Sequence, residues 1–393
     1  MLTSADQLMT HLRALCEIGA RPTATEAERR AADYVQAALA SFGISDSRRF
    51  EFETIDSAGW TFIPYMALGA LALPASRLGV VGKLLGAVML LAGAYNVREA
   101  LLAKPPVYHP LVGNSASQTI IARIPPRGET RHFAYIVAHL DTNKQRFLLP
   151  FVVPTLTRAL NTLGLLLAGA GGVSMLLDAL TGRKAPRPIQ TLAGLGVLGI
   201  LAGMLYDETQ PYVQGANDNA SAVAVALGLA ETLAAQPLEH TEVTLLFTGS
   251  EETGCVGMEK YLDQFAPPRE HSTFIDLEMV GAGELCYIQR HGVSLFSEYH
   301  PAPQITALAA QVARAHPDLR VTGRPITILE EVAPLVRRGY EAICIAGYDA
   351  TGMLPNWHRV SDRLENIEPD TLERAARYVL ALVNALDKKP GKT

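Results

Sequence analysis

The sequence predicts an α/β protein in which a mostly parallel sheet is flanked by helices on both faces, with two apolar helical hairpins inserted. Short apolar runs typical of buried strands alternate with helical patterns along most of the 393 residues. That alternation is characteristic of parallel sheets. Polar residues directly follow several of the runs, and two pairs of long, nearly charge-free segments interrupt the order.

The N-terminal part predicts two amphipathic helices and a strand. Between Ser4 and Phe42 the apolar residues recur with helical spacing on both sides of a turn at residues 19–23. Residues 48–55 then alternate as a strand does. The first residues lack the basic and apolar regions of a signal peptide, and we expect none.

Two pairs of apolar segments follow, each pair separated by a turn. Each segment is close to the about 17–25 residues needed to cross a bilayer. We therefore expect both hairpins to contact the lipid bilayer. The alternative is a buried lid or the surface of a homo-oligomer. The segments are residues 58–76 and 78–95, then 159–177 and 189–206, with a basic turn at 182–188.

Glycines spaced by four occur in both hairpins. They are Gly82 and Gly86 in the first and Gly199 and Gly203 in the second. Because glycine lets two helix backbones approach closely, we expect helix contacts at these positions.

The remaining sequence predicts alternating strands and helices around the hairpins. We expect one α/β domain of residues 1–57, 104–145 and 209–393, with hairpins at 58–103 and 146–208. Its further strands are predicted at 118–124, 133–139, 243–248, 272–280 and 342–346, and its further helices at 221–235, 258–265, 307–315 and 370–386.

Composition excludes some classes of function. The net charge of -5 provides no basic surface for nucleic acid. The four cysteines stand far apart in the chain, so we expect neither a disulfide framework nor a thiolate zinc site.

The first polar group follows the strand 133–139. His139 and Asp141 are two residues apart, and in an extended chain such residues point to the same side. The Asp141 carboxylate can then accept a hydrogen bond from the His139 ring, which turns the other ring nitrogen toward a metal.

The second group precedes the helix 221–235. Asp218 lies between Asn217 and Asn219 after a glycine turn. A helix cap is one interpretation. The clustering of an acid with two amides favours a carboxylate that bridges two metals.

Paired acids follow a third apolar strand. Glu251 and Glu252 are adjacent, and two like charges side by side are costly unless a cation or solvent offsets them. One can bind a metal while the other takes a proton from the attacking water.

Acids also lie within the strand 272–280, and a histidine lies near the C-terminus. Buried carboxylates such as Asp276 and Glu278 need partners, and His358 stands in a polar loop before the last helix. Together with the other groups they match a two-metal hydrolase, whose cations lie about 3.5–4 Å apart and share a carboxylate.

The order and wording of these groups resemble the co-catalytic zinc exopeptidases, which include bacterial leucyl aminopeptidase, aminopeptidase Y and glutamate carboxypeptidase. The resemblance extends from residues 18–22 to the last helix and leaves out only the hairpins. It implies two zinc ions per chain. His139 would bind the first zinc with Asp141 orienting it, Asp218 would bridge both, Glu251 would be the general base, and Glu252 and His358 would hold the second zinc.

One position departs from the family pattern. The family has an aspartate where this chain has Glu278. We expect Glu278 to bind the first zinc, with Asp276 as the alternative. Residues 329–331 also lack the Ser-Asp-His wording of the family, so substrate preference does not carry over.

The resemblance implies a zinc exopeptidase that acts on peptides, with aminopeptidase action preferred over carboxypeptidase action, and the apolar hairpins indicate that it is associated with a membrane. The alternatives are a non-catalytic membrane scaffold and a single-zinc acyl transferase of the glutaminyl cyclase type. Basic residues in the hairpin turns favour an active site outside the cell. The missing signal peptide favours the cytoplasmic side, which we expect.

Overall fold

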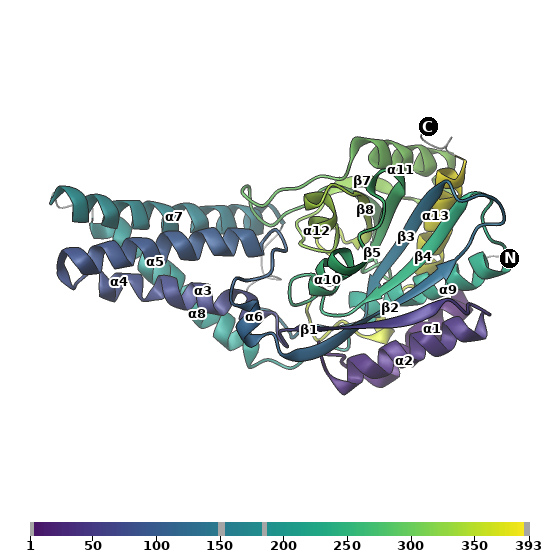
Figure 1. The fold of residues 1–393 in the computed structure, drawn as a ribbon, viewed down its shortest axis with the longest axis horizontal. Coiled ribbons are helices and arrows are strands. Elements are labelled where there is room, and N and C mark those ends of the chain that lie inside the picture. Colours follow the sequence, from purple (N-terminus) through teal and green to yellow (C-terminus); the bar gives the residue numbers. More distant parts are fainter. Residues whose placement is uncertain (1–3, 148–153, 183–186, 389–393) are drawn as a thin grey trace.

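The computed structural model describes residues 4–147, 154–182 and 187–388. An α/β portion carries a long helical bundle that projects from one side (Figure 1). The sheet and its helices place the polar groups, and the bundle comes from the two apolar hairpins.

The α/β portion is built on a single eight-stranded sheet with the order β1-β2-β4-β3-β5-β8-β6-β7. Its centre, from β4 through β3 and β5 to β8, is parallel. β1, β2 and β6 join this centre in antiparallel pairs. The strands are β1 (Ser47–Thr54), β2 (Ser115–Ile124), β3 (His132–His139), β4 (Thr241–Thr248), β5 (Ser272–Glu278), β6 (Glu284–Arg290), β7 (Thr322–Pro325) and β8 (Glu341–Tyr348).

Helices cover both faces of the sheet, as the sequence predicts. One face carries α1 (Ala5–Ile18), α2 (Glu26–Ser41), α9 (Ala222–Ala235), α11 (Pro303–Ala315) and α13 (Pro369–Asp387). The other carries α10 (Val256–Phe265) and α12 (Val332–Arg337). β6, β7 and α12 are elements that the sequence did not predict, and α6 (His109–Val112) is a further short helix.

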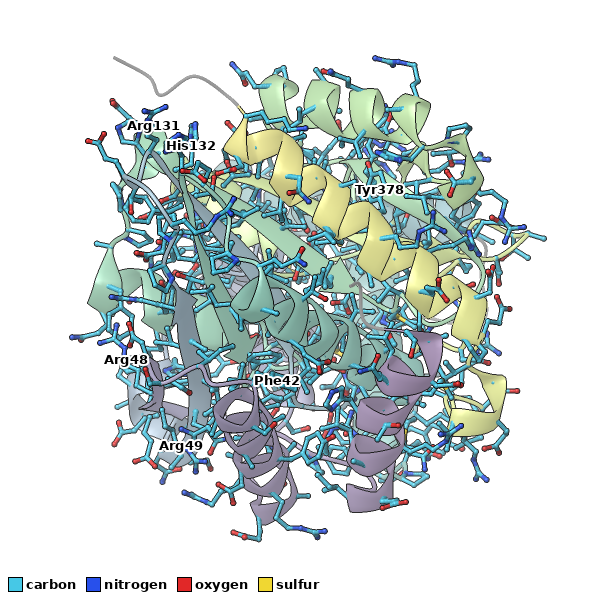
Figure 2. All side chains as sticks on the ribbon, turned by 90° about the vertical axis from the view of Figure 1, so that its right-hand side faces the viewer. Phe42, Arg48, Arg49, Arg131, His132 and Tyr378 are labelled. Carbon is cyan, nitrogen blue, oxygen red and sulfur yellow. The ribbon has the colours of Figure 1, made fainter. Side chains whose placement is uncertain are left out.

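The strands are buried on both sides, which explains their continuous apolar runs. Ile136 of β3 belongs to the core beneath α9 and α13, and its neighbour Val137 belongs to the core on the opposite face. Figure 2 shows α13 crossing the end remote from the bundle, where the Tyr378 hydroxyl donates to the carbonyl of Ala309 on α11 (2.8 Å). On β1, Arg49 reaches Gln36 of α2 (Nε–Oε1 3.1 Å).

The two hairpins, separated in sequence by the strands β2 and β3, pack together as one bundle. Helix α5 lies between α3 and α7, and α8 contacts both α3 and α7. Among the described residues, α5, α7 and α8 are long and apolar enough to cross a membrane, whereas residues 59–75 form shorter apolar helices. The helices are α3 (Gly59–Ala70), α4 (Ala72–Ala75), α5 (Gly79–Ala100), α7 (Pro154–Thr181) and α8 (Arg187–Glu208). Residues 183–186 of the predicted basic turn lie outside the described residues.

Small residues allow close contacts inside the first hairpin. A Cβ on Gly82 would lie 2.1 Å from the carbonyl oxygen of Ala75, and one on Gly86 would lie 2.6 Å from that of Ala72. The expected helix contact is confirmed there. It is wrong for Gly199, which has nothing within 4 Å of its Cβ position and faces outward. Large apolar side chains cover the outer surface of the bundle, among them Leu163, Leu166, Leu192, Leu195 and Leu198.

The parallel strands end at one edge of the sheet. His139 is the last residue of β3 and pairs with Thr248, the last residue of β4. Glu278 is the last residue of β5. Open α/β sheets collect ligand-binding side chains at the carboxyl ends of their strands.

Candidate metal centre

The Asp218 carboxylate lies between two histidine rings. Its Oδ1 is 3.3 Å from His139 Nε2, and its Oδ2 is 3.3 Å from His358 Nε2. Asp218 comes from the irregular helical turn η1 (Ala216–Ser221), which leads into α9. The structure thus brings together three residues that are spread over more than half of the sequence.

A first group of ligand atoms surrounds His139. Its Nε2 is 3.3 Å from Glu278 Oε1, and with Asp218 these residues can offer one ligand atom each to a common point. Asn219 fixes Glu278 from behind, because its side-chain amide donates to Glu278 Oε2 (3.1 Å) and to the Leu277 carbonyl (2.8 Å).

A second group surrounds His358. Its Nε2 is 3.2 Å from Glu252 Oε2, and Asp218, Glu252 and His358 again can share a point. The side chain of Asn143 donates to Glu252 Oε2 (2.7 Å) and so holds this carboxylate in place. The two groups have the Asp218 carboxylate in common.

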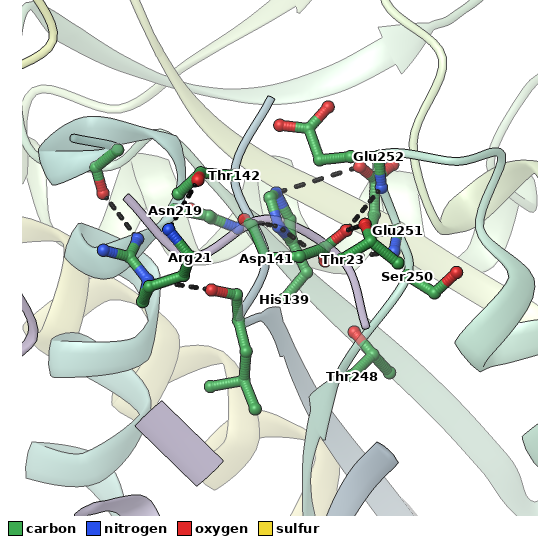
Figure 3. Close-up of polar contacts among 12 residues, drawn as sticks. Arg21, Thr23, His139, Asp141, Thr142, Asn219, Thr248, Ser250, Glu251 and Glu252 are labelled. Carbon is green, nitrogen blue, oxygen red and sulfur yellow. Dashed lines mark hydrogen bonds and ion pairs between the residues drawn. The ribbon is translucent and has the colours of Figure 1, made fainter. Parts of the chain in front are cut away.

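Asp141 connects the histidine to the paired glutamates, in a way that differs from the sequence-based expectation. His139 Nδ1 is 3.0 Å from the backbone carbonyl of Asp141, whereas the carboxylate Oδ1 is 3.6 Å away. The carboxylate instead accepts hydrogen bonds from the backbone N–H groups of Glu251 and Glu252 (both 3.1 Å) and from the Thr23 hydroxyl (2.6 Å). Asp141 therefore orients the ring through its backbone and the glutamates through its side chain (Figure 3).

Glu251 lies beside the group around His139 and the group around His358, and it is a member of neither. Its Oε2 is 3.9 Å from His139 Nε2, and its side chain lines a cavity next to the site. Burial raises the pKa of the Glu251 carboxyl well above its ordinary value, and the neighbouring charges of Glu252 and Glu278 add to this while His139 opposes it. Such a group is suited to accept a proton from water.

Glu278, and not Asp276, lies at His139. Asp276 belongs to a different buried cluster, with Glu330 and Cys344. In that cluster Glu330 accepts hydrogen bonds from the Tyr299 hydroxyl (2.8 Å) and the Val332 backbone (2.7 Å). The geometry favours the first of the two candidate ligands that the sequence offers.

The charges of the site call for cations. Asp141, Asp218, Glu251, Glu252 and Glu278 form a cluster of carboxylates beside the imidazoles of His139 and His358, and all are buried or nearly so. Burial alone would raise the pKa of Asp218, but hydrogen bonds and charges from His139 and His358 hold that pKa below its usual range. Burial raises the pKa of Glu278 to about 7 in spite of His139.

The donor atoms fit zinc. Imidazole nitrogens and carboxylate oxygens are ligands that zinc takes in catalytic sites. Among the described residues, the buried Glu252 Oε1 has no hydrogen-bond partner although it lies in this polar cluster. A cation between Asp218, Glu252 and His358 would satisfy the electrostatic requirement that these side chains create.

The backbone is unusual where several of these residues lie. Ser250 (φ 61°), Met279 (φ 52°) and His358 (φ 51°) are all in the left-handed region, which costs energy for residues other than glycine. Each sits at, or next to, a proposed ligand or base. Such conformations gather at functional sites because the surrounding structure holds them there.

Several residues that support the site were not predicted. Arg21 is almost completely buried, and its guanidinium donates to the carbonyls of Leu140 (2.9 Å) and Gly215 (2.9 Å). Asp362 accepts from the backbone N–H groups of Asn217 (2.6 Å) and Asp218 (3.1 Å). Their partners are backbone groups far away in the chain, and no local pattern in the sequence predicts such contacts.

Comparison with families places this site in a known context. The model of peptidase family M28 matches residues 201–383, which include Asp218, Glu251, Glu252, Glu278 and His358. A Caenorhabditis elegans protein named as an endoplasmic reticulum metallopeptidase is 28% identical over 192 residues. The match covers 47% of this chain and 20% of that protein, so the chain spans about a fifth of its relative's length.

Solved structures share the fold. A zinc aminopeptidase from Bacillus subtilis superposes with a TM-score of 0.59 at 16% identity, over 98% of this chain and 95% of that one. A glutaminyl cyclase from Bacteroides thetaiotaomicron gives 0.59 at 15% identity, over 98% and 99% of the two chains. The family match and the shared fold confirm the resemblance to co-catalytic zinc exopeptidases that the sequence indicated.

Proposed function

We propose that this chain is a membrane-associated aminopeptidase that uses two zinc ions. The family match and the fold support a metallopeptidase. The position of Asp218, with one carboxylate oxygen 3.3 Å from each histidine, is the observation that carries the finer proposal. A carboxylate so placed can bridge two cations.

The proposed roles divide the side chains between two metals. His139 and Glu278 would hold the first zinc, Glu252 and His358 would hold the second, and Asp218 would contribute to both sites; these residues form groups whose ligand atoms lie close enough together to share an ion. Asp141 acts through position, because it fixes the Glu251–Glu252 backbone and the His139 ring. The domain formed by residues 1–57, 104–145 and 209–393 is the proposed catalytic domain.

The proposed chemistry is hydrolysis of an amide. Zinc, when bound, polarises the substrate carbonyl and lowers the pKa of water. Glu251 takes the proton from the attacking water and delivers it to the leaving nitrogen. Asp141, Asn143 and Asn219 hold Glu251 and the proposed ligands in position through hydrogen bonds.

The charges around the site favour amino- over carboxypeptidase action. A carboxypeptidase needs a cation for the terminal carboxylate of its substrate. Among the described lining residues of the adjoining cavity, the arginine is Arg146, and its guanidinium is already bonded to Glu208 (2.7 Å) and Asn143 (2.7 Å).

The bundle supports attachment to a membrane. Three of its helices are long and apolar enough to cross one, and their outward side chains are apolar. We propose that the bundle is embedded in lipid and that the α/β portion lies on the cytoplasmic side. Protease protection of the α/β portion in sealed vesicles of known orientation tests the side.

A panel of aminoacyl amides tests the activity. Free aminoacyl amides and short peptides are incubated with protein reconstituted with zinc, and the same peptides with acetylated N-termini serve as controls. Release of the N-terminal residue from the free peptides alone supports an aminopeptidase. Cleavage from the C-terminus of acetylated peptides would replace this proposal with a carboxypeptidase.

Two other functions give different outcomes. A single-zinc acyl transferase of the glutaminyl cyclase type, favoured by the shared fold, would bind one zinc and cyclise N-terminal glutamine with release of ammonia. A membrane scaffold would bind less than one zinc and release nothing. The ligand set His139, Asp218, Glu252, Glu278 and His358 favours the two-zinc hydrolase over both.

A further inference from the structure

A cavity connects the candidate metal centre with the interior of the bundle. Its volume is about 310 Å³, at the lower end of the range of ligand pockets. Glu251, Glu252 and His358 line one end. The bundle helices α3, α5, α7 and α8 line the rest, with Tyr65, Leu90, Gly93, Ala168, Val197 and Ile200 as examples. Helices that have no part in binding metal therefore form most of the space next to it.

The cavity is long compared with one amino-acid residue. On α7 its lining extends from Thr157 to Ala168, which at about 1.5 Å per residue is roughly 16 Å along the helix. An extended chain covers only about 3.3–3.6 Å per residue. An aminopeptidase holds a single residue on the acyl side of the scissile bond. The long part of the substrate must then lie on the leaving-group side.

The chemistry of the lining distinguishes between possible occupants. Beyond Asn161, the α7 residues that face the cavity are Gly164, Leu165 and Ala168, and the opposing α5 residues are Leu90, Gly93, Ala94 and Val97. A peptide placed there would bury backbone N–H and C=O groups without partners, at a cost of several kcal/mol each. An alkyl chain has no such groups.

Small residues create this space. Gly164 has only the Ile200 Cδ1 atom, at 4.0 Å, near the position of a Cβ. The lining at Gly164 is therefore open at the Cβ position, where only Ile200 of α8 lies at ordinary contact distance. Gly93 differs, because a Cβ there would lie 3.0 Å from the Tyr65 carbonyl.

We propose that the substrates of this site are aminoacyl amides whose leaving group carries a long unbranched alkyl chain, which the bundle cavity accommodates. The inference rests on the proposed aminopeptidase function and names its substrate class. In the reaction, water adds across the bond between the acyl carbon and the amide nitrogen. The hydroxyl goes to the carbon and the proton to the nitrogen, which releases a free amino acid and a long-chain alkylamine.

The test uses full-length protein in phosphatidylcholine vesicles with zinc. The substrates are n-alkylamides, from ethyl to dodecyl, of the amino acid that is cleaved best as a simple amide. Gly164→Leu fills the cavity, and Gly199→Leu adds the same side chain on the outer surface, where nothing lies within 4 Å of the Cβ position. Comparing variants on the same substrate removes the effect of partitioning into the vesicles.

We expect kcat/KM of the wild type and of Gly199→Leu to increase from the ethyl to the decyl amide. In Gly164→Leu the ratio of decyl to ethyl amide should fall by about tenfold or more, since each buried methylene contributes up to a factor of about four. Equal ratios in the three proteins would overturn the proposal. So would faster cleavage of an apolar peptide than of the dodecyl amide.

A second measurement needs no variant. Alkylamines, the expected products, should inhibit the cleavage of the simple amide by wild type with a potency that increases with chain length. Inhibition independent of length contradicts the proposal even if Gly164→Leu does not fold. If no amide of any length is cleaved, the aminopeptidase function itself fails, and that outcome is distinct from cleavage without a preference for chain length.

Discussion

Arg146 and Glu208 form an ion pair at the junction between the bundle and the metal centre (Nη1–Oε1 2.7 Å). Arg146 also donates to Asn143 Oδ1 (2.7 Å), and the Asn143 amide holds the Glu252 carboxylate (2.7 Å). A proposed zinc ligand is thus connected to the last residue of α8 through two side chains. The position of the bundle and the geometry of the site are physically linked.

Replacing Glu208 should weaken this link. The Glu208 carboxylate also accepts hydrogen bonds from Lys144 (2.8 Å) and from the Ser57 hydroxyl (2.5 Å). We expect Glu208→Gln to lower the free energy of unfolding by about 2–3 kcal/mol, because two largely buried cations lose their counter-charge. Thermal unfolding in vesicles measures the change in stability, and kcat/KM measures the effect on the site. Glu239→Gln removes an exposed ion pair with Arg127 and should change stability by less than about 0.5 kcal/mol.

Glu251→Gln tests the proposed base. The amide keeps the size of the side chain but cannot accept a proton from water, so kcat should fall by about 10²–10⁴. Zinc content should stay at the wild-type value, because Glu251 is not a proposed ligand. Activity that survives this substitution would remove Glu251 from the mechanism.

Asp218→Asn separates a bridging carboxylate from an ordinary ligand. Since Asp218 faces both His139 and His358, its replacement should weaken the binding of both zinc ions. His358→Ala should weaken the binding of the second zinc ion only. Metal analysis after dialysis against a mild chelator should give close to two zinc ions per chain for wild type, about one for His358→Ala and fewer than one for Asp218→Asn. Equal loss in the two variants contradicts the bridge.

Glu278→Asp examines the position at which we expect, from the sequence, a departure from the family pattern. Aspartate is shorter by one carbon–carbon bond of about 1.5 Å, while Asn219 and the strand end that hold Glu278 stay in place. We expect weaker binding of the first zinc and a lower kcat. Asp276→Asn, on the alternative candidate, should leave the zinc content unchanged. The opposite pattern would exchange their roles.

The outer surface of the bundle provides a test of membrane insertion. Leu166 and Leu195 are more than half exposed on α7 and α8. A charged side chain near the bilayer centre costs about 2.5–3.5 kcal/mol. The double change to glutamate should therefore reduce the protein recovered in the alkali-washed membrane fraction, whereas the double change to methionine should not. Unchanged fractionation with an altered oligomeric state would favour a lid or dimer surface.

Much of the architecture could be predicted from the sequence because its signals are local. The strand ending in His139 and the strand followed by Glu251 each combine an apolar run with polar residues at its end, and the sheet then brings those ends together. Contacts between distant segments could not be predicted. The ion pair of Arg146 with Glu208 spans 62 residues, and the packing of both hairpins into one bundle depends on which apolar faces meet.

Local patterns also misled where tertiary contacts decide. The glycine spacing that marks a close contact at Gly86 leaves Gly199 on the outside. The side chains of Asp141 and His139 do lie close together. The Asp141 carboxylate, however, accepts hydrogen bonds from the N–H groups of Glu251 and Glu252, and the His139 ring contacts the backbone carbonyl of Asp141 instead. Short elements such as β7, with its Thr-Gly-Arg-Pro sequence, carry no periodic signal at all.

The position of β4 has a consequence for biosynthesis. It lies between β2 and β3, which precede the second hairpin, yet β4 itself follows that hairpin in the chain. During synthesis β2 and β3 are therefore made before β4, the strand that lies between them. β4 can be added to the sheet only after α7 and α8 have been made. A nascent chain therefore cannot complete the sheet, or bring the side chains of the candidate centre together, before the helices of the second hairpin have been synthesised.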